Sequence, residues 1–223
     1  MTQIECDALL FDLDGVLIDS GNCVKRHWED WARQHGIEMA DVMRVAHGIR
    51  TIETMRIVAP HLDAEEEAER FKAAEVADTE GVTATEGALA LLEVLPGDAW
   101  AIVTSGSREL ALARLKTAGL SVPNVLVSGD DVRQGKPSPE PYLVGASRLG
   151  KPSHNCLVIE DAPAGIEAAR AAGMQVVGIA ATHFQEELNC SVVVDRLSAL
   201  HIQVLEGKDN CLLVQIVAPD TKK

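Results

Sequence analysis

Two aspartates separated by one residue follow a short apolar run near the N-terminus. Asp12 and Asp14 stand in the stretch Phe11-Asp12-Leu13-Asp14-Gly15-Val16. In an extended chain, residues two positions apart project to the same side, so both carboxylates would face one site. Gly15 then permits an abrupt change of direction. An Asp-Gly pair after a strand can also make only a turn, so this motif alone leaves a structural role open.

Polar residues end or follow other apolar runs further along the chain. Thr104 and Ser105 offer hydroxyl and amide groups that can hold an oxyanion, and Lys136 brings a positive charge in a proline-flanked loop. Glu160 and Asp161 close another apolar run. Each feature has an ordinary alternative, such as a turn, a surface lysine or a helix N-cap. Together they predict a ligand site, because open α/β sheets bind ligands at the carboxyl ends of their strands.

The acids in this set would need a cation. If Asp12, Asp14 and Asp161 converge, each pair of charges about 4 Å apart costs about 4 kcal/mol at an effective dielectric constant of about 20. Clustered carboxylates without nearby His or Cys suit the hard cation Mg²⁺. Such an ion, together with Lys136, would also offset the charge of a bound phosphate. An acidic protein can therefore still bind an anionic substrate.

The elements that must position these residues alternate between short apolar runs and helical patterns, which predicts an α/β fold with a parallel sheet. We expect strands near Ala8–Phe11, Trp100–Thr104, Val125–Val127, Leu157–Ile159, Val176–Ile179 and Val192–Val194. We expect helices over Arg108–Ala118, Pro141–Leu149 and Ala164–Ala172, with Gly119, Gly150 and Gly173 at their C-terminal caps.

Two segments break this alternation. Residues 20–86 contain helical patterns such as Val24–His35 and Ala64–Asp78 and no convincing strand, which predicts an inserted helical domain. The rest of the chain, residues 1–19 and 87–223, would then form one discontinuous core. Near the C-terminus, His201–Leu205 and Cys211–Val217 alternate around Gly207-Lys208-Asp209-Asn210, which predicts a β-hairpin.

The composition excludes several classes of partner. The 223 residues carry a net charge of -14, which argues against nucleic acid and anionic membrane surfaces. Residues of the hydrophobic types make up 47% of the chain, yet only 3% are aromatic, so the core must be mainly aliphatic. Five scattered cysteines without a CxxC pair, and the lack of a signal peptide, predict reduced thiols in a cytoplasmic protein. The sequence does not decide between a monomer and a homodimer.

The four motifs, in this order, resemble those of the haloacid dehalogenase superfamily. The family's Asp-x-Asp-Gly is matched by Asp12, Asp14 and Gly15, and its strand-end Thr or Ser by Thr104. Its lysine is matched by Lys136, and its acidic pair by Glu160 and Asp161. The resemblance covers residues 7 to about 180. It implies a Rossmann-like core, with residues 20–86 as an α-helical cap domain.

The resemblance also implies a mechanism, which the residue chemistry supports. Asp12 would attack phosphorus to form an aspartyl-phosphate, and Asp14 would protonate the leaving alkoxide and then activate water. Mg²⁺ would be held by the Asp12 side chain, the Asp14 carbonyl and Asp161, with Glu160 acting directly or through water. The set Thr104, Ser105 and Lys136 would hold the phosphoryl oxygens. Dehalogenases of the superfamily need no acid like Asp14, so phosphoryl chemistry is favoured.

The segment His47-Gly48-Ile49-Arg50-Thr51 resembles the cap motif of the sugar, glycerol and 2-deoxyglucose-6-phosphate phosphatase branch. In that setting Arg50 would bridge to the substrate phosphate as the cap closes, and His47 or Glu53 would meet sugar hydroxyls. An exposed helix residue is the alternative for Arg50. The expected function is thus magnesium-dependent hydrolysis of small sugar or polyol phosphates.

Two other functions use the same residues. A phosphomutase of the β-phosphoglucomutase kind shares the core and a helical cap, and would return the phosphoryl group to a sugar. A non-catalytic phosphosugar sensor would bind without turnover, but it gives no reason to retain Asp14. The branch resemblance in the cap favours the phosphatase. Which sugar or polyol phosphate is preferred depends on how the cap closes, which the sequence does not give.

Overall fold

The centre of the molecule is a six-stranded sheet. The computed structural model describes residues 2–205 and 211–216. The strands follow the order β6-β5-β2-β7-β8-β9, and each neighbouring pair runs parallel. Their bounds are β2 Ala8–Phe11, β5 Trp100–Val103, β6 Val125–Val127, β7 Cys156–Glu160, β8 Gln175–Ile179 and β9 Val193–Val194. The six strands expected from the sequence are confirmed, with ends shifted by at most one residue.

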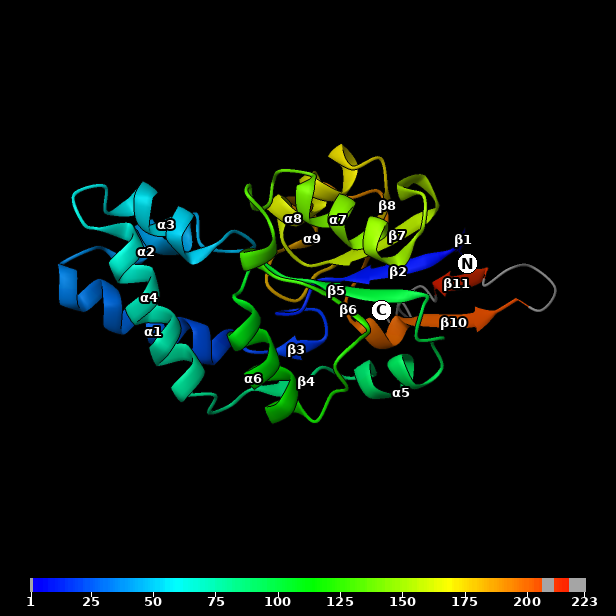
Figure 1. The fold of residues 1–223 in the computed structure, drawn as a ribbon, viewed down its shortest axis with the longest axis horizontal. Coiled ribbons are helices and arrows are strands. Elements are labelled where there is room, and N and C mark those ends of the chain that lie inside the picture. Colours follow the sequence, from blue (N-terminus) through cyan, green and yellow to red (C-terminus); the bar gives the residue numbers. More distant parts are fainter. Residues whose placement is uncertain (1, 206–210, 217–223) are drawn as a thin grey trace, which may run out of the picture.

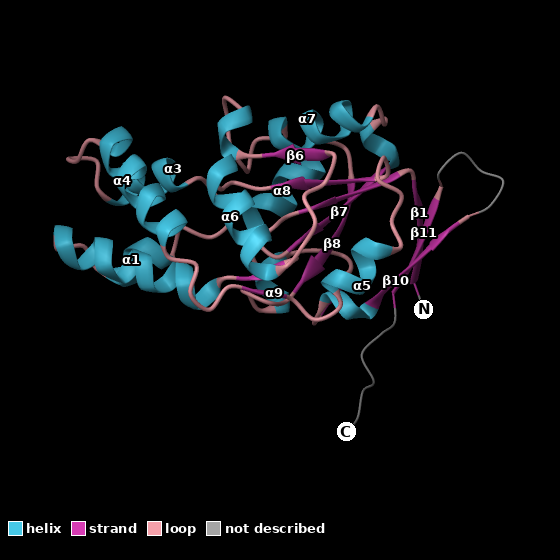
Figure 2. Cartoon of the chain, turned by 60° about the horizontal axis from the view of Figure 1, so that its bottom comes forward, coloured by secondary structure: helices cyan, strands magenta, loops and turns pink. Residues whose placement is uncertain are grey.

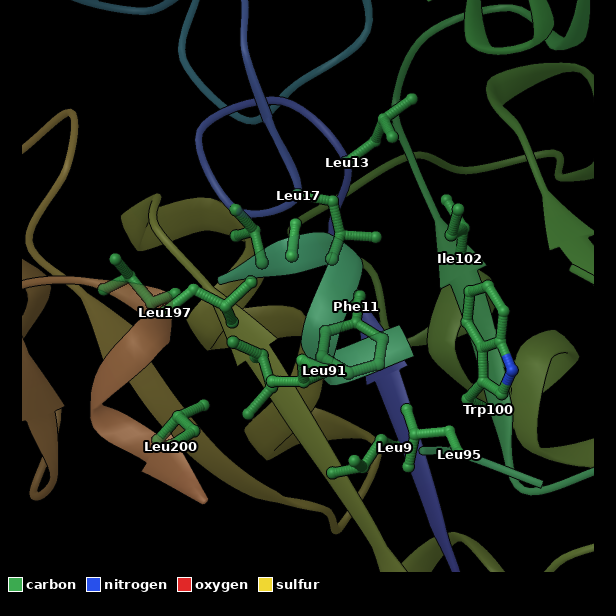
Figure 3. Close-up of a cluster of buried hydrophobic side chains, with 14 of the residues drawn as sticks. Leu9, Phe11, Leu13, Leu17, Leu91, Leu95, Trp100, Ile102, Leu197 and Leu200 are labelled. Carbon is green, nitrogen blue, oxygen red and sulfur yellow. The ribbon is translucent and has the colours of Figure 1, made fainter. Parts of the chain in front are cut away.

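Alternate residues of the central strands pack on opposite faces of this sheet. Leu9 and Phe11 of β2 belong to one hydrophobic cluster, and Ala8 and Leu10 to another. This separation follows from the two-residue period of a strand, and burial on both faces explains why these runs are continuously apolar. In Figure 3 the side chains of Leu9, Phe11 and Trp100 gather on the first face with leucines from neighbouring segments.

Helices cover both faces. The first face carries residues of α5 (Ala88–Glu93) and α6 (Arg108–Ala118), and the second carries α7 (Glu140–Leu149), α8 (Pro163–Ala171) and α9 (Gln185–Leu188). Helix α6 begins where the Ser107 hydroxyl accepts a hydrogen bond from the Leu110 amide, and it ends at Gly119 in the left-handed region. Short 3₁₀ turns lie at Gly129–Asp131, Ser153–Asn155 and Leu197–Ala199.

A helical segment projects from the core at one end of the molecule (Figure 1). It contains α1 (Gly21–His35), α2 (Met39–Met43), α3 (Thr51–Val58) and α4 (Ala64–Ala77). Its own hydrophobic cluster includes Trp28, Trp31 and Phe71, so much of the chain's scarce aromatic content lies here. A two-stranded antiparallel ribbon of β3 (Ile18–Asp19) and β4 (Thr83–Ala84) joins it to the core. Strand β4 was not predicted from the sequence, because it is only two residues long. The limits 20 and 86 of the insert stay a prediction.

The three-stranded antiparallel sheet β1-β11-β10 lies at the other end, away from the helical segment (Figures 1 and 2). Strands β10 (Leu200–Val204) and β11 (Leu212–Ile216) pair antiparallel, as the predicted hairpin requires. The predicted turn at 207–210 and the predicted last residue, Val217, lie outside the described residues. Strand β1 (Thr2–Cys6), which pairs with β11, was not predicted from the sequence, because only Asp7 separates it from β2.

Two further observations bear on the class of protein. Across residues 2–205 and 211–216, none of the helices combines the length and apolar character needed to cross a membrane. All five cysteines are free thiols, as expected.

Candidate active site

Four neighbouring strands, β5, β2, β7 and β8, end at one cavity of about 340 Å³. Asp12 follows β2, Thr104 follows β5 and Asp161 follows β7, and all three line the cavity. Asp14 and Ser105 line it as well. The parallel register explains the convergence, since Phe11 lies beside Ile102 on one side and Ile159 on the other. The sheet therefore brings together carboxylates and hydroxyls that are far apart in the sequence.

A buried lysine links two of the acids. The Nζ of Lys136 lies 2.5 Å from Oδ1 of Asp12 and 2.6 Å from Oε1 of Glu160. The Tyr142 hydroxyl donates to the same Oε1 at 3.0 Å. Lys136 is 1% exposed and Glu160 fully buried, so these charges exist only because they are paired. Lys136 thus contacts Asp12, the expected nucleophile, but does not itself line the cavity.

Glu160 is occupied by this network. Its Oε2 accepts hydrogen bonds from the amides of Asp161 and Ala162, at 2.8 and 2.9 Å, while Oε1 is taken by Lys136 and Tyr142. Four donors use the lone pairs of both oxygens. Glu160 does not line the cavity. Its position therefore suits holding Lys136, and it differs from the metal-binding role expected from the sequence.

The balance of charge at the site is negative. Burial raises the pKa of Asp12 to about 7, although Lys136 opposes the shift. Burial also raises the pKa of Asp161, and the neighbouring Glu160 and Asp12 raise it further. For Lys136 burial acts to lower the pKa, but the carboxylates of Asp12 and Glu160 outweigh it and raise the pKa above its usual range. When all four groups are ionised, the three acids Asp12, Glu160 and Asp161 together with Lys136 carry a net charge of minus two.

The donor set fits a hard divalent cation. Asp12 and Asp161 supply two carboxylates on the cavity wall, and oxygen donors are what Mg²⁺ prefers. Gly15 lies so close that a Cβ there would stand 2.0 Å from Oδ2 of Asp161, so the loop after Asp14 packs directly against this carboxylate. In the described part of the chain, no three His, Cys, Asp or Glu side chains group as a metal site. An ion here would therefore rely on two carboxylates, a backbone carbonyl and water.

The opposite side of the cavity offers hydrogen-bond donors. The Thr104 hydroxyl oxygen accepts from the Gly106 amide at 3.1 Å, and its hydrogen stays available to a ligand. Thr104, Ser105 and Gly106 line the cavity just before α6, whose N-terminus favours an anion. The Ser105 hydroxyl donates to the carbonyl of Gly48, at 2.8 Å, so it is engaged by the helical segment.

The residues expected from the helical segment divide into two groups. His47 lines the cavity, and its ring meets that of His183 edge to face. Arg50 and Glu53 do not line it. The Arg50 guanidinium pairs with Glu53 at 2.5 Å and donates to the carbonyls of Val132 and Arg133 in the core. The structure thus places Arg50 and Glu53 at the contact between segment and core rather than at the cavity.

Two buried charged residues at the cavity were missed by sequence reasoning. Arg114 of α6 is 4% exposed and Glu75 of α4 is 5% exposed, and both line the cavity. Each stands on the buried face of its helix, four residues after Leu110 or Phe71. A charged residue within an apolar helical stripe was the available signal. Ser20 and Thr182, which bond Asp14 and Asp161, carried no comparable signal.

Comparison with known proteins agrees with this geometry. The family model described as "Haloacid dehalogenase-like hydrolase" matches residues 9–179, which is most of the chain and includes all four motifs. The chain belongs to this family. The resemblance inferred from Asp12, Thr104, Lys136 and Asp161 is therefore confirmed, and so is the expected hydrolase class.

Curated relatives of this hydrolase come from the predicted branch. It is 44% identical over 191 residues to "Hexitol phosphatase A" of Escherichia coli, covering 83% of this chain and 88% of the relative. It is 35% identical to "Glycerol-1-phosphate phosphohydrolase 2" of Saccharomyces cerevisiae, covering 90% and 86%. It is 32% identical to "2-deoxyglucose-6-phosphate phosphatase 2" of the same yeast over the full length of both.

Solved structures share the fold of this hydrolase. A hydrolase from Pseudomonas syringae superimposes with a TM-score of 0.76 at 29% identity, covering 86% of this chain and 94% of the other. A β-phosphoglucomutase from Clostridium difficile superimposes with a TM-score of 0.68 at 22% identity, covering 86% and 92%. The second likeness bears on the fold alone.

Proposed function

We propose that this hydrolase cleaves small sugar or polyol phosphate monoesters through an aspartyl-phosphate on Asp12. The observation that carries the proposal is the placement of Asp12, whose Oδ1 is held by buried Lys136 while its side chain lines the cavity. The other carboxylate oxygen is then left for attack on phosphorus. The names of the relatives, which are hexitol, glycerol and 2-deoxyglucose phosphatases, support phosphate monoesters as substrates.

Two transfers at phosphorus complete the proposed reaction. Asp12 forms a bond to phosphorus as the ester P–O bond breaks, and the departing alkoxide takes a proton from Asp14. Water then attacks the phosphoryl group, Asp14 accepts the water's proton, and the bond to Asp12 breaks to release phosphate. The Thr104 hydroxyl and the Ser105 amide, both on the cavity wall, hold the phosphoryl oxygens through both transfers.

Magnesium is part of this proposal. The Asp12 and Asp161 carboxylates and the Asp14 carbonyl would hold Mg²⁺, which supplies positive charge to phosphoryl oxygens and relieves repulsion between the two acids. Lys136 supplies a second positive charge, next to Asp12, and Glu160 keeps it there.

We also propose that residues 20–86 act as a cap that excludes water. Support comes from contacts that cross to the core, Ser105 to Gly48 and Arg50 to Val132 and Arg133. The cavity between them, of about 340 Å³, lies near the lower end of small-molecule sites. That size suits a substrate of a few carbons with one phosphate.

A phosphate-release screen tests the function. Sugar and polyol phosphates of two to six carbons are assayed with Mg²⁺ and with a chelator. We expect release that requires the metal, and an Asp12→Asn variant that loses at least about 10³-fold in kcat, as removal of a nucleophile does. Product analysis with β-glucose 1-phosphate should give free phosphate, since a mutase would give the isomer.

The chain offers a matched control for Asp12→Asn. Asp7 directly precedes β2, at the opposite end of the same strand, and bonds Asn155 at 2.8 Å. Asp7→Asn should keep kcat within about twofold of the parent enzyme, since it changes no group near the cavity. Absence of metal-dependent release from every ester, or equal loss in both variants, would contradict the proposal.

A further inference from the structure

The carboxylate of Asp14 is held by residues outside the sheet. Its Oδ1 accepts a hydrogen bond from the Ser20 hydroxyl at 2.6 Å, and its Oδ2 lies 2.8 Å from Nη1 of Arg114. Ser20 directly precedes α1, and Arg114 lies in α6. The side chain of Asp14 is 27% exposed, toward the cavity it lines. The orientation of this carboxylate is therefore set by its side-chain partners as well as by the strand that leads to it.

Arg114 is itself held from the helical segment. Its Nη2 lies 2.8 Å from Oε1 of Glu75 in α4, and the side chains of Arg114 and Glu75 are 4% and 6% exposed. Helix α4 belongs to the segment and α6 to the core, and the two pack against each other. The guanidinium therefore spans from the segment to the motif that carries Asp14. A planar fork with several donors suits such a bridge, because one group can hold two carboxylates in fixed directions.

The pair is placed where an apolar contact would be expected. Neighbours on the same helix faces are Leu110 and Leu115 on α6, and Phe71 on α4, all buried. Burial raises the pKa of Glu75 to about 7 although Arg114 opposes the shift, which reflects how unfavourable a charge is at this position. Replacing a buried ion pair with apolar residues is often neutral or stabilising. Stability alone therefore does not explain a charged link at this point.

We propose that Glu75 and Arg114 are positioning residues that couple the place of helix α4 to the carboxylate of Asp14. Arg114 touches Asp14 directly, and Glu75 acts through Arg114. When α4 lies against α6, the link holds Asp14 in its place at the cavity, and when α4 moves away, Arg114 loses one anchor and Asp14 loses a fixed partner. This inference rests on the proposed role of Asp14 in proton transfer, and it assigns part of that control to the cap.

Glu75→Gln tests the link with little change of shape. Proton transfer by a positioned acid or base contributes about 10²- to 10⁴-fold, so partial loss of its position should lower kcat about tenfold. The KM should stay within about twofold if the phosphate contacts are unaffected. The matched control is Glu67→Gln, on the same helix, where a buried carboxylate bonds Trp31 and His35 inside the segment. That variant should lose stability without loss of kcat.

A double-mutant comparison separates positioning from a general effect. With 4-nitrophenyl phosphate, whose leaving group needs little protonation, Asp14→Asn should still release 4-nitrophenol in the first transfer, to Asp12, and this single-turnover burst is the activity measured. Adding Glu75→Gln to Asp14→Asn should then cost no further activity, because coupled residues are non-additive. A full additional tenfold loss in that background would overturn the inference. So would equal kcat losses in Glu75→Gln and Glu67→Gln.

A crystal structure of Glu75→Gln gives a result that does not need turnover. We expect the Asp14 carboxylate to leave its contact with Arg114. Retention of the Asp14 and Arg114 contact at its present distance would refute the coupling even if the enzyme proves to be a phosphatase. Failure of the phosphate-release screen with a displaced Asp14 would instead refute the proposed function alone.

Discussion

The core and the helical segment hold their charged side chains in different ways. At the sheet edge, Lys136 lies between Asp12 and Glu160, and the lysine and Glu160 are almost completely inaccessible to solvent. At the contact with the segment, Arg50 is 18% exposed on its side chain and reaches core carbonyls at 3.2 and 3.3 Å. The network around Lys136 is buried, and its hydrogen bonds are 2.5 and 2.6 Å long. The contacts of Arg50 with the core are partly exposed to solvent and longer.

The difference teaches which part of the site is fixed. The positions of Asp12 and Glu160 follow from backbone hydrogen bonds of adjacent strands, which cannot shift without breaking the sheet. The contacts of Arg50 join the segment to the core through a few partly exposed polar groups, and breaking these contacts alone costs little. Under the proposed function, the core would therefore preorganise the reacting groups, and the segment would control access to them.

The largest expected effect tests the buried network. Lys136→Met leaves Asp12 and Glu160 without their shared cation, and removing one partner of a buried pair costs about 3–5 kcal/mol. We expect the free energy of unfolding, measured in urea, to fall by that amount and phosphate release to be lost. Lys116→Met, an exposed lysine on α6, is the control and should change neither. Unchanged stability in Lys136→Met would break the proposed contrast between the two regions.

A smaller effect is expected from two helical glycines, one in each region. A Cβ on Gly165, in the first turn of α8, would lie 1.6 Å from Oε1 of Glu160 and force that carboxylate away from Lys136. Gly165→Ala should therefore cost about 1–3 kcal/mol, the range for overpacked sites. A Cβ on Gly21, at the start of α1, meets only Asp19 at 3.8 Å. Gly21→Ala should leave the melting temperature equal or higher, and equal losses in both would contradict the argument.

The smallest effect concerns the segment's contact with the core. Arg50→Met removes a partly exposed ion pair and should change stability by less than about 1 kcal/mol. The KM for a sugar phosphate should rise about threefold to tenfold, which corresponds to about 1 kcal/mol of lost docking. Inhibition by inorganic phosphate should change little, because Arg50 does not line the cavity.

Arg56→Met is the control for this experiment. Arg56 also lies on α3, but it pairs with the exposed Glu65 within the segment. It should leave both constants unchanged. If Arg50→Met weakens inhibition by inorganic phosphate as strongly as it raises the KM for the sugar phosphate, then Arg50 contacts the phosphoryl group directly, as the sequence first suggested.

Much of the core could be predicted because its signals are local. Continuous apolar runs mark strands buried on both faces, and Gly119 and Gly150 mark helix ends. Strand β1 was missed because it is mostly exposed and lies directly before β2. The network around Glu160 could not be predicted, since nothing in a strand-end acid says whether it will face a ligand or accept four internal hydrogen bonds.

The sequence by itself determined the order of strands and helices, the family, and the residues that end the strands at Asp12, Thr104 and Asp161. These features depend on residues a few positions apart and on motifs of consecutive residues, both of which can be recognised in the sequence. The tertiary structure alone decided that Arg50 turns to the core and that Glu75 reaches Asp14 through Arg114. Such contacts depend on how the helical segment packs against the core, and the local pattern of apolar and polar residues does not determine that packing.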